Sequence, residues 1–438
     1  MTYQETLDFL YAQLPMFSRI GPAALKKDLT NTRLLADLAG NPHKHLKTIH
    51  IAGTNGKGSS SHMLASIFQA AGYKTGLYTS PHLQDFRERI RVNGRMIPEQ
   101  EVIDFTENYR QSFLHIEPSF FEVTVVMAFE YFLKEKTDIA IIETGLGGRL
   151  DSTNIITPEL SLITNIGLDH VHLLGDTLEK IAYEKAGIIK AAVPVVVSQT
   201  QTGPDRVFRQ KAEAEKSPIV FGDAVRQTVH TEAGTQTLDV TYHNSHTDKS
   251  EKYRTDLTGL YQAANMAGVL SAIDILRQKG WNISDAAVET GLGTVKANTG
   301  LMGRWEILQE SPLVVFDVGH NEDGMRQIIT QLQHTGYNQL HIVIGMVSDK
   351  DVEKVLRLLP TNAYYYFTQA AIPRALPSGE LKSLAEAKGL KGQSYETVDA
   401  AVKEAYSRVR SNDLLLICGS VFVVGEVDRG IFRPPSPL

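Results

Sequence analysis

The chain has 438 residues, 42% of them apolar and 21% charged, which is typical of a globular protein with enough chain for two to three domains. Its 44 basic and 50 acidic residues give a net charge of −6, which argues against a broad nucleic-acid-binding surface. A single cysteine, Cys418, excludes an internal disulfide, and no apolar run approaches the roughly 20 residues that span a bilayer. Because the N-terminus has no signal-peptide pattern, we expect a cytoplasmic protein.

The first strong pattern along the chain is a glycine-rich loop within the sequence KTIHIAGTNGKGS. The β-branched run before the loop predicts a buried strand, and an amphipathic stretch after it predicts a helix that begins near Ser59. Gly53, Gly56 and Gly58 would let backbone N–H groups turn inward, and Lys57 adds a positive charge. These features together predict a phosphate-binding loop. An ordinary strand-to-helix turn is the alternative, but the flanking elements favour the phosphate site.

Strands and helices alternate after this loop, which predicts an α/β fold. Apolar runs predict strands at residues 74–79, 138–143, 160–165 and 193–198, and helical periodicity is found at 98–113 and 121–134. Continuous apolar strands separated by helices indicate a parallel sheet covered on both faces. Residues 222–258 are polar and alternate in places, which suggests a small antiparallel excursion before a helix over 260–279.

A second α/β unit begins near Leu313. Its strands are predicted within the sequences LVVFDVGH, HIVIGM, AYYYFTQ and DLLLICGS, with helices between them. The short polar stretch KANTGLM, residues 296–302, separates it from the first unit. We therefore predict two domains, at residues 1–298 and 299–438.

Polar residues follow several strands of the first domain. Glu143 ends one predicted strand, and Ser80 and His170 follow two others. The carboxyl ends of parallel strands meet at one edge of a sheet, where α/β proteins bind ligands. A carboxylate, a hydroxyl and an imidazole would together hold Mg²⁺ with several waters. A turn carboxylate and a structural histidine are the alternatives.

Five further features are weaker. The segment SPHLQDFRERIR is either a solvated charged helix or a loop that clamps an anionic substrate. In the second domain, Asp317 and His320 follow a strand and could contact a ribose and a phosphate, or cap the next helix. Arg304 is suited to a phosphate. Asn265 lies on a predicted helix, either facing a cleft or as a buried amide, whereas Lys185 is expected to be an ordinary exposed helix lysine.

Taken together, these motifs resemble folylpolyglutamate synthase and dihydrofolate synthase, the folate branch of the Mur ligase superfamily. The matching segments are AGTNGKGS, SPHLxxFxERI, ETGLGGRLDSTN, LDH, EKAGI, YQxxN, GRxE, DxGHN and GxxxDKD, in the family's order over essentially the whole chain. The resemblance implies a P-loop central domain with a parallel sheet and a smaller Rossmann-like C-terminal α/β domain, with ATP and substrates between them. It also implies that a pteroate or folate carboxylate attacks the γ-phosphate of ATP. L-Glutamate then displaces phosphate from the acyl phosphate, and ADP is left.

The resemblance also assigns roles to individual residues. It implies that ATP is contacted by Gly53, Thr54, Asn55, Gly56, Lys57, Gly58, Ser59, Asn265, Arg304, Asp317 and His320. It implies that Mg²⁺, at two sites, is held by Ser59, Ser80, Glu143 and His170. The pteroate or folate would be contacted by Ser119, Phe120, Phe121, Glu122, Leu150, Asp151 and Ser152. The implied catalytic residues are Lys57, Lys185 and His170, and Lys185 matches a lysine that is carbamylated in the family, which would turn a cation into an anion beside the metal.

Departures from the family pattern leave the acceptor open. The pteroate segment begins at Gly21 and reads GPAALKKDLTNT, and the C-terminal motif reads DVGHNE, with Glu322 in place of proline. Dihydropteroate, folylpolyglutamate or both therefore stay possible acceptors. The expected protein is a monomer that acts on small molecules, with neither nucleic acid nor a membrane as partner.

Two rival functions are weighed against this one. The first is a cell-wall-type Mur ligase or another ATP-dependent amino-acid ligase. A cell-wall Mur ligase would carry a UDP-sugar domain before a loop that usually reads TGKT. Here Lys57 comes too early for such a domain and the loop reads NGKG. A P-loop regulatory protein without catalysis is the other rival, and the polar residues at the strand ends argue against it.

Overall fold

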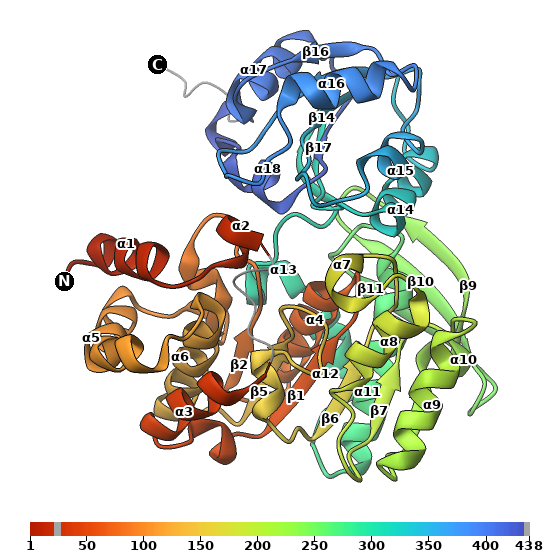
Figure 1. Cartoon of the computed structure of the whole chain (residues 1–438). Coiled ribbons are helices and arrows are strands. Elements are labelled where there is room, and N and C mark those ends of the chain that lie inside the picture. The colour runs from red at the N-terminus through yellow and green to blue at the C-terminus, as the bar shows by residue number, and fades with distance from the viewer. Residues whose placement is uncertain (22–27, 433–438) are drawn as a thin grey trace, which may run out of the picture. The chain divides into compact units, whose positions relative to one another are not determined.

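The structure, a computed structural model, describes residues 1–21 and 28–432 (Figure 1). Residues 22–27, which belong to the predicted pteroate segment, lie outside the described residues. The chain divides into two compact units. The first comprises Met1–Glu232, Asp239–Asp256 and Tyr261–Leu301, and the second comprises Ala233–Leu238, Leu257–Leu260 and Met302–Leu438. Among the helices described, none combines the length and the apolar character needed to cross a membrane.

The first unit is built on an eight-stranded sheet with the order β4-β3-β2-β5-β1-β6-β7-β8. Its strands are β1 (Thr48–Ala52), β2 (Thr75–Tyr78), β3 (Ile90–Val92), β4 (Arg95–Met96), β5 (Ile139–Glu143), β6 (Leu160–Ile163), β7 (Val195–Val197) and β8 (Ile219–Phe221). The strands from β2 to β8 in this order run parallel, as predicted. The antiparallel edge strands β3 and β4 were not predicted. Their signal was the Asn93-Gly94 turn, where both residues have a positive φ, as a tight hairpin requires.

Helices cover both faces of this sheet. The helices of this unit are α1 (Tyr3–Gln13), α2 (Phe17–Ile20), α3 (Thr30–Leu38), α4 (Lys57–Ala70), α5 (Glu99–Ile116), α6 (Phe120–Lys134), α7 (Val171–Leu174), α8 (Leu178–Ala186), α9 (Pro204–Ala214), α10 (Gly222–Val225), α11 (Gln262–Gln278), α12 (Asp285–Gly293) and α13 (Val295–Thr299). Helices α4 and α11 pack on one face, with α12 beside α4 (Figure 1). Helices α6, α8 and α9 pack on the alternate strand residues, such as Ile142 and Ile163. Both faces are therefore apolar, which explains the continuous apolar strands.

A three-stranded sheet forms the predicted antiparallel excursion. Its strands are β9 (Arg226–Ala233), β10 (Leu238–Asn244) and β11 (Lys249–Thr255). Connections this short require antiparallel neighbours. The buried Arg226 guanidinium lies 2.8 Å from the Glu251 carboxylate on β11 and 2.7 Å from Asp274 on α11, so an ion-paired group ties this sheet to the helix.

The second unit has a six-stranded sheet with the order β12-β13-β17-β14-β15-β16. The strands are β12 (Glu306–Glu310), β13 (Leu313–Phe316), β14 (Leu340–Ile344), β15 (Tyr364–Phe367), β16 (Gly392–Ser394) and β17 (Leu414–Cys418). Its helices are α14 (Glu322–Gln333), α15 (Val352–Leu356), α16 (Ser378–Glu386), α17 (Val398–Arg408) and α18 (Val421–Glu426). All neighbours are parallel except the edge strand β12, so the four predicted strands are confirmed as the parallel core of this unit.

The close packing of α12 on α4 can be tested with one added methyl group. A Cβ at Gly291 would lie 2.5 Å from the Ile67 Cα, so one helix must move. We expect Gly291→Ala to lower the free energy of unfolding by about 1–3 kcal/mol in urea titrations. Gly293→Ala is the matched control, because a Cβ there meets nothing within 4 Å in the same helix. Equal stability of the two variants would contradict this packing.

Candidate active site

The glycine-rich loop connects the end of β1 to the start of α4. Helix α4 begins at Lys57, two residues earlier than predicted, with Gly56 as its N-cap at φ 86°. A Cβ at Gly53 would lie 1.8 Å from Thr164 Oγ1, and a Cβ at Gly56 would lie 2.2 Å from Asn265 Oδ1. Neighbouring side chains therefore require glycine at both positions, in addition to the positive φ of each.

The strand order gathers the predicted polar residues at one edge of the sheet. Strands β2, β5, β1 and β6 are consecutive parallel neighbours, so their carboxyl ends lie side by side. Ser80 follows β2, Glu143 ends β5, the glycine-rich loop follows β1, and the segment with His170 follows β6. The sheet edge that the sequence predicts is thus present.

The segment after β6 is joined to the glycine-rich loop by hydrogen bonds. The backbone N–H of Thr54 donates to the Asn165 carbonyl (2.8 Å), and that of Asn55 donates to Asn165 Oδ1 (2.8 Å). Gly167 N–H donates to Thr54 Oγ1 (2.9 Å), and Thr164 Oγ1 donates to the Asn55 carbonyl (2.5 Å). The N–H groups of Thr54 and Asn55 are therefore engaged by protein. The N–H groups suited to an anion are those of the first turn of α4, which have no partner within the helix.

Two lysines converge on one carbonyl of this loop. Lys57 Nζ donates to the carbonyls of Gly53 (3.1 Å) and Thr54 (3.2 Å), and Lys185 Nζ donates to the Gly53 carbonyl (2.7 Å). Lys185 is 4% exposed, so the expectation of an exposed helix lysine was wrong. Spacing along α8 does not reveal the cause, which is that this face of the helix packs against a loop distant in sequence.

A buried glutamine, which we did not predict, connects two predicted ATP contacts. Gln262 Nε2 donates to Ser59 Oγ (3.1 Å), and Asn265 Nδ2 donates to Gln262 Oε1 (2.9 Å). Gln262 is fully buried, and Asn265 is 8% exposed. The i, i+3 spacing of the two amides on one helix face was the available signal.

The loop after β5 is organised by Asp151. Its carboxylate accepts from Leu146 N–H (2.8 Å), Thr153 N–H (3.0 Å) and Thr153 Oγ1 (2.5 Å). Burial raises the pKa of Asp151. His50, in the middle of β1, approaches Thr153 Oγ1 through Nε2 at 2.8 Å. Asp151 therefore shapes this loop, in addition to any contact with a substrate.

The same loop is held against α8. Arg149 N–H donates to the Glu184 carbonyl (2.7 Å), and the two side chains form an ion pair at 2.9 Å. A Cβ at Gly187 would lie 2.3 Å from the Arg149 Cα, and a Cβ at Gly148 would lie 2.9 Å from the Lys185 carbonyl. The two backbones thus touch directly, which places Lys185 beside the loop that follows Glu143.

The predicted folate residues at the start of α6 have mixed surroundings. Ser119 and Glu122 form a capping box, and Glu122 also accepts from Thr32 Oγ1 (3.1 Å). Phe120 is 3% exposed, whereas Phe121 is half-buried, and a Cβ at Gly145 would lie 2.5 Å from its ring. The Phe121 ring therefore lies against the loop after β5.

Arg89 is a buried cation that lies against the start of α6. Its guanidinium lies 5.3 Å from the centroid of the Phe120 ring, and its Nε donates to His82 Nδ1 (2.8 Å). Arg89 is 8% exposed and makes no ion pair with a carboxylate of the described residues, whereas Arg87 pairs with Asp85 (2.7 Å). Burial, and then Arg89, lowers the pKa of His82 to about 3. The solvated-helix interpretation is therefore wrong for Arg89, because its charge lies inside the protein.

In the second unit, Asp317 follows β13. Its carboxylate accepts from Trp305 N–H (2.8 Å) and Gly319 N–H (2.8 Å). Arg304, which precedes Trp305, is therefore held near Asp317, and His320 Nδ1 lies 3.0 Å from the Val318 carbonyl. The N-cap of α14 is Asn321, so neither Asp317 nor His320 has the capping role that was the alternative.

No cluster of three or more His, Cys, Asp or Glu side chains suited to a metal occurs within residues 1–21 and 28–432. The predicted metal set contains two such residues, Glu143 and His170, with the hydroxyls of Ser59 and Ser80. These donors suit a hard cation that keeps several waters, such as Mg²⁺.

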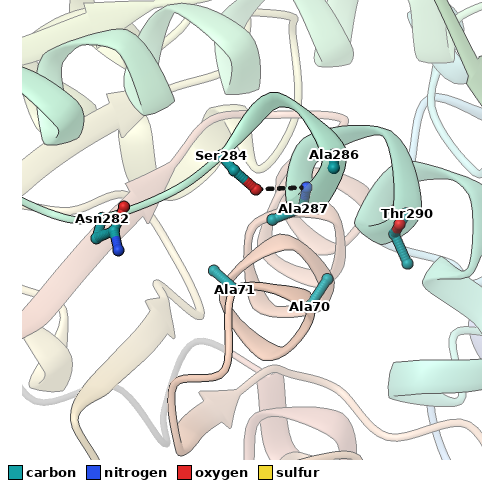
Figure 2. A pocket seen from close by; sticks show the side chains of 7 residues that line it. All are labelled: Ala70, Ala71, Asn282, Ser284, Ala286, Ala287 and Thr290. Carbon is teal, nitrogen blue, oxygen red and sulfur yellow. Dashed lines mark hydrogen bonds between the residues drawn. The ribbon is translucent and has the colours of Figure 1, made fainter.

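A pocket of about 270 Å³ lies at the C-terminal end of α4 (Figure 2). It is lined by Ala70, Ala71, Asn282, Ser284, Ala286, Ala287 and Thr290. None of the residues predicted from the sequence to form the site is among them.

The buried His50 makes folding stability depend on pH. Burial lowers the pKa of His50 to about 3, and its Nδ1 makes no hydrogen bond to the described residues. Between about pH 6.5 and pH 3, His50 is therefore protonated in the unfolded chain and neutral in the folded chain, so its contribution to stability falls as pH falls. The free energy of unfolding of the parent should drop faster than that of His50→Gln below about pH 6.5, by up to about 1.4 kcal/mol per pH unit. Urea titrations at several pH values test this, and parallel curves would contradict it.

Comparisons with known proteins agree with this geometry. The model of the Mur ligase middle domain matches residues 51–273, and that of the Mur ligase glutamate ligase domain matches residues 303–421. A dihydrofolate synthase/folylpolyglutamate synthase of Bacillus subtilis (strain 168) is 35% identical, with 98% of each chain covered.

Solved structures give the same result. E. coli FolC in complex with DHPP and ADP has a TM-score of 0.86 and 29% identity, with 98% of each chain covered. A bifunctional folylpolyglutamate synthase/dihydrofolate synthase with Mn, AMPPNP and L-glutamate bound has a TM-score of 0.84 and 26% identity, with 99% of this chain and 98% of that one covered. The predicted two-domain α/β fold is confirmed, and the chain belongs to the dihydrofolate synthase/folylpolyglutamate synthase family of Mur ligases.

Proposed function

We propose that this chain is an ATP-dependent ligase that joins L-glutamate to the carboxyl group of dihydropteroate, of a folate polyglutamate, or of both. The observation that carries the proposal is the glycine-rich loop after β1, which is hydrogen-bonded to the segment after β6. The chain is similar to such ligases over nearly its whole length. Relatives hold ADP with DHPP, and AMPPNP with Mn and L-glutamate. ATP, a divalent cation and a pterin acceptor are therefore the proposed ligands.

Lys57 and the first turn of α4 would bind the ATP phosphates. The helix has 14 residues, and its early N–H groups and its dipole favour an anion at this end. Lys57 would add a positive charge that neutralises the charge developing on the transferred phosphoryl group. Phosphoryl transfer depends mainly on such positioning and charge neutralisation. The acceptor carboxylate then attacks phosphorus, and the amine of glutamate displaces phosphate from the acyl phosphate.

The divalent cation would be held at the carboxyl edge of the sheet. The proposed ligands are Ser59, Ser80, Glu143 and His170, which lie on or after four neighbouring elements of this edge. Glu143 is 5% exposed and supplies the carboxylate. When bound, the cation would neutralise phosphate charge. Asn265 is linked to Ser59 through Gln262, so nucleotide and cation contacts would be coupled.

The acceptor would contact the residues around the loop after β5. Phe121 lies against Gly145, and Leu150 is 38% exposed in the same loop. The buried Arg89 guanidinium is suited to an anionic part of the substrate, because no carboxylate within residues 1–21 and 28–432 forms an ion pair with it and a buried charge without a counter-ion is costly. The remaining proposed contacts are Ser119, Phe120, Glu122, Asp151 and Ser152.

We further propose an ATP-binding central domain of residues 1–298 and a C-terminal domain of residues 299–438 that contributes Arg304, Asp317 and His320 to the nucleotide. The family resemblance supports this division. It also supports a monomer, and the single cysteine suits a reducing cytoplasm.

The first test is turnover. Purified protein should release ADP with Mg-ATP, L-glutamate and either dihydropteroate or tetrahydrofolate, and running the two acceptors side by side identifies the preferred one.

Lys57→Ala should lower kcat by at least about a hundredfold, because it removes the charge that stabilises the transition state. Lys134→Ala, an exposed lysine on α6, is the control. Near-normal turnover in Lys57→Ala would refute the phosphate role, and absence of ADP with every acceptor would refute the ligase.

Carbamylation of Lys185 has its own test. The neutral amine would add carbon dioxide and lose a proton, which gives an anion near the proposed cation site. With isotopically labelled bicarbonate, we expect one carbamate resonance in the parent and none in Lys185→Arg. The control Lys180→Arg, at an exposed lysine on the same helix, should keep it. A parent spectrum without this resonance would contradict the modification.

A further inference from the structure

A glutamine, Gln201, forms two hydrogen bonds with the segment that follows β6. Gln201 Oε1 accepts from Ile166 N–H (2.7 Å), and Gln201 Nε2 donates to the Ile166 carbonyl (2.7 Å). One side chain thus satisfies both polar groups of one residue, in the manner of a neighbouring strand. Two hydrogen bonds fix the orientation of this backbone as well as its position.

Gln201 is itself anchored. It lies between β7 and α9, and its backbone N–H donates to Asp205 Oδ1 (2.9 Å). The residue before it, Thr200, is bound through its N–H and its hydroxyl to the Asp223 carboxylate, at 2.7 Å each. Ile166 is 1% exposed in an apolar cluster that includes Ile181. Moving Ile166 would therefore disturb a packed cluster, and moving Gln201 would break the hydrogen bond from its own backbone.

The residues on either side of Ile166 both form hydrogen bonds with the glycine-rich loop. Asn165 accepts from the N–H groups of Thr54 and Asn55, and Gly167 donates to Thr54 Oγ1. Support therefore passes along the carboxyl edge of the sheet in strand order, from the loop after β7 to the loop after β6 and then to the loop after β1.

We propose that Gln201 is a positioning residue for nucleotide binding, an inference that rests on the proposed function. By fixing the backbone of Ile166, it holds Asn165 and Gly167 where they keep the glycine-rich loop in its phosphate-binding shape. Gln201 is placed to act on the nucleotide through this loop and not by contact. Its loss should therefore weaken nucleotide binding while the acceptor side of the site is unchanged.

Gln201→Met tests this proposal, because it keeps the length of the side chain and removes both hydrogen bonds. We expect the Kd for ADP, measured by calorimetry, and the KM for ATP to rise about tenfold, with the KM for the pterin acceptor within about twofold of the parent. Backbone amide exchange at Thr54 and Asn55 should also accelerate. Gln210→Met, an exposed glutamine on α9, is the matched control and should leave all these values unchanged.

A purely structural role would give different results. A lower melting temperature with unchanged ADP affinity, or an equal rise of both KM values, would overturn the proposal. Should Gln201→Met fail to fold, Gln201→Glu decides, because it keeps the bond from Ile166 N–H and loses the bond to the carbonyl. It should raise the Kd for ADP more than about threefold, and an unchanged Kd would overturn the proposal. If the parent binds ADP without ligation, the proposed ligase fails, while the ratio of Kd values still decides the role of Gln201.

Discussion

The glycine-rich loop takes its shape from the loop of the neighbouring strand. Hydrogen bonds from Thr54 and Asn55 to Asn165 use the N–H groups that a free loop would offer to an anion. The first turn of α4 is then left as the donor surface, next to Lys57. The two loops lie so close together that a Cβ at Gly53 would collide with Thr164, which explains the glycine at this position. The parallel order of β1 and β6 makes this contact possible, so the site depends on the sheet.

Two lysines meet at one peptide of this loop. The Gly53 carbonyl accepts from both Lys57 and Lys185, which brings two side-chain nitrogens to a single oxygen. Phosphate at Lys57 and a carbamate at Lys185 are the two anions proposed here. Helix α8 contacts the loop that follows Glu143, and this contact places Lys185 near the proposed cation site.

Periodicity and motif order predicted most of the fold but little of this network. The parallel strands were predicted because each is a short apolar run between helices, and the edge pair β3 and β4 was missed although Asn93-Gly94 signals a hairpin. Lys185 was misjudged because its burial comes from a loop more than a hundred residues earlier. Gln201 and Gln262 carry no motif, and their roles arise from side-chain geometry that spacing along one chain does not contain.

The acyl phosphate is the chemical step on which the proposed function depends. If the acceptor carboxylate attacks the γ-phosphate and glutamate then displaces phosphate, one carboxylate oxygen must leave with the phosphate. Turnover with an acceptor whose carboxylate carries heavy oxygen measures this directly by mass spectrometry of the inorganic phosphate. We predict one labelled oxygen in each phosphate released during ligation. Phosphate without label, formed at the same rate as the amide product, would contradict the mechanism.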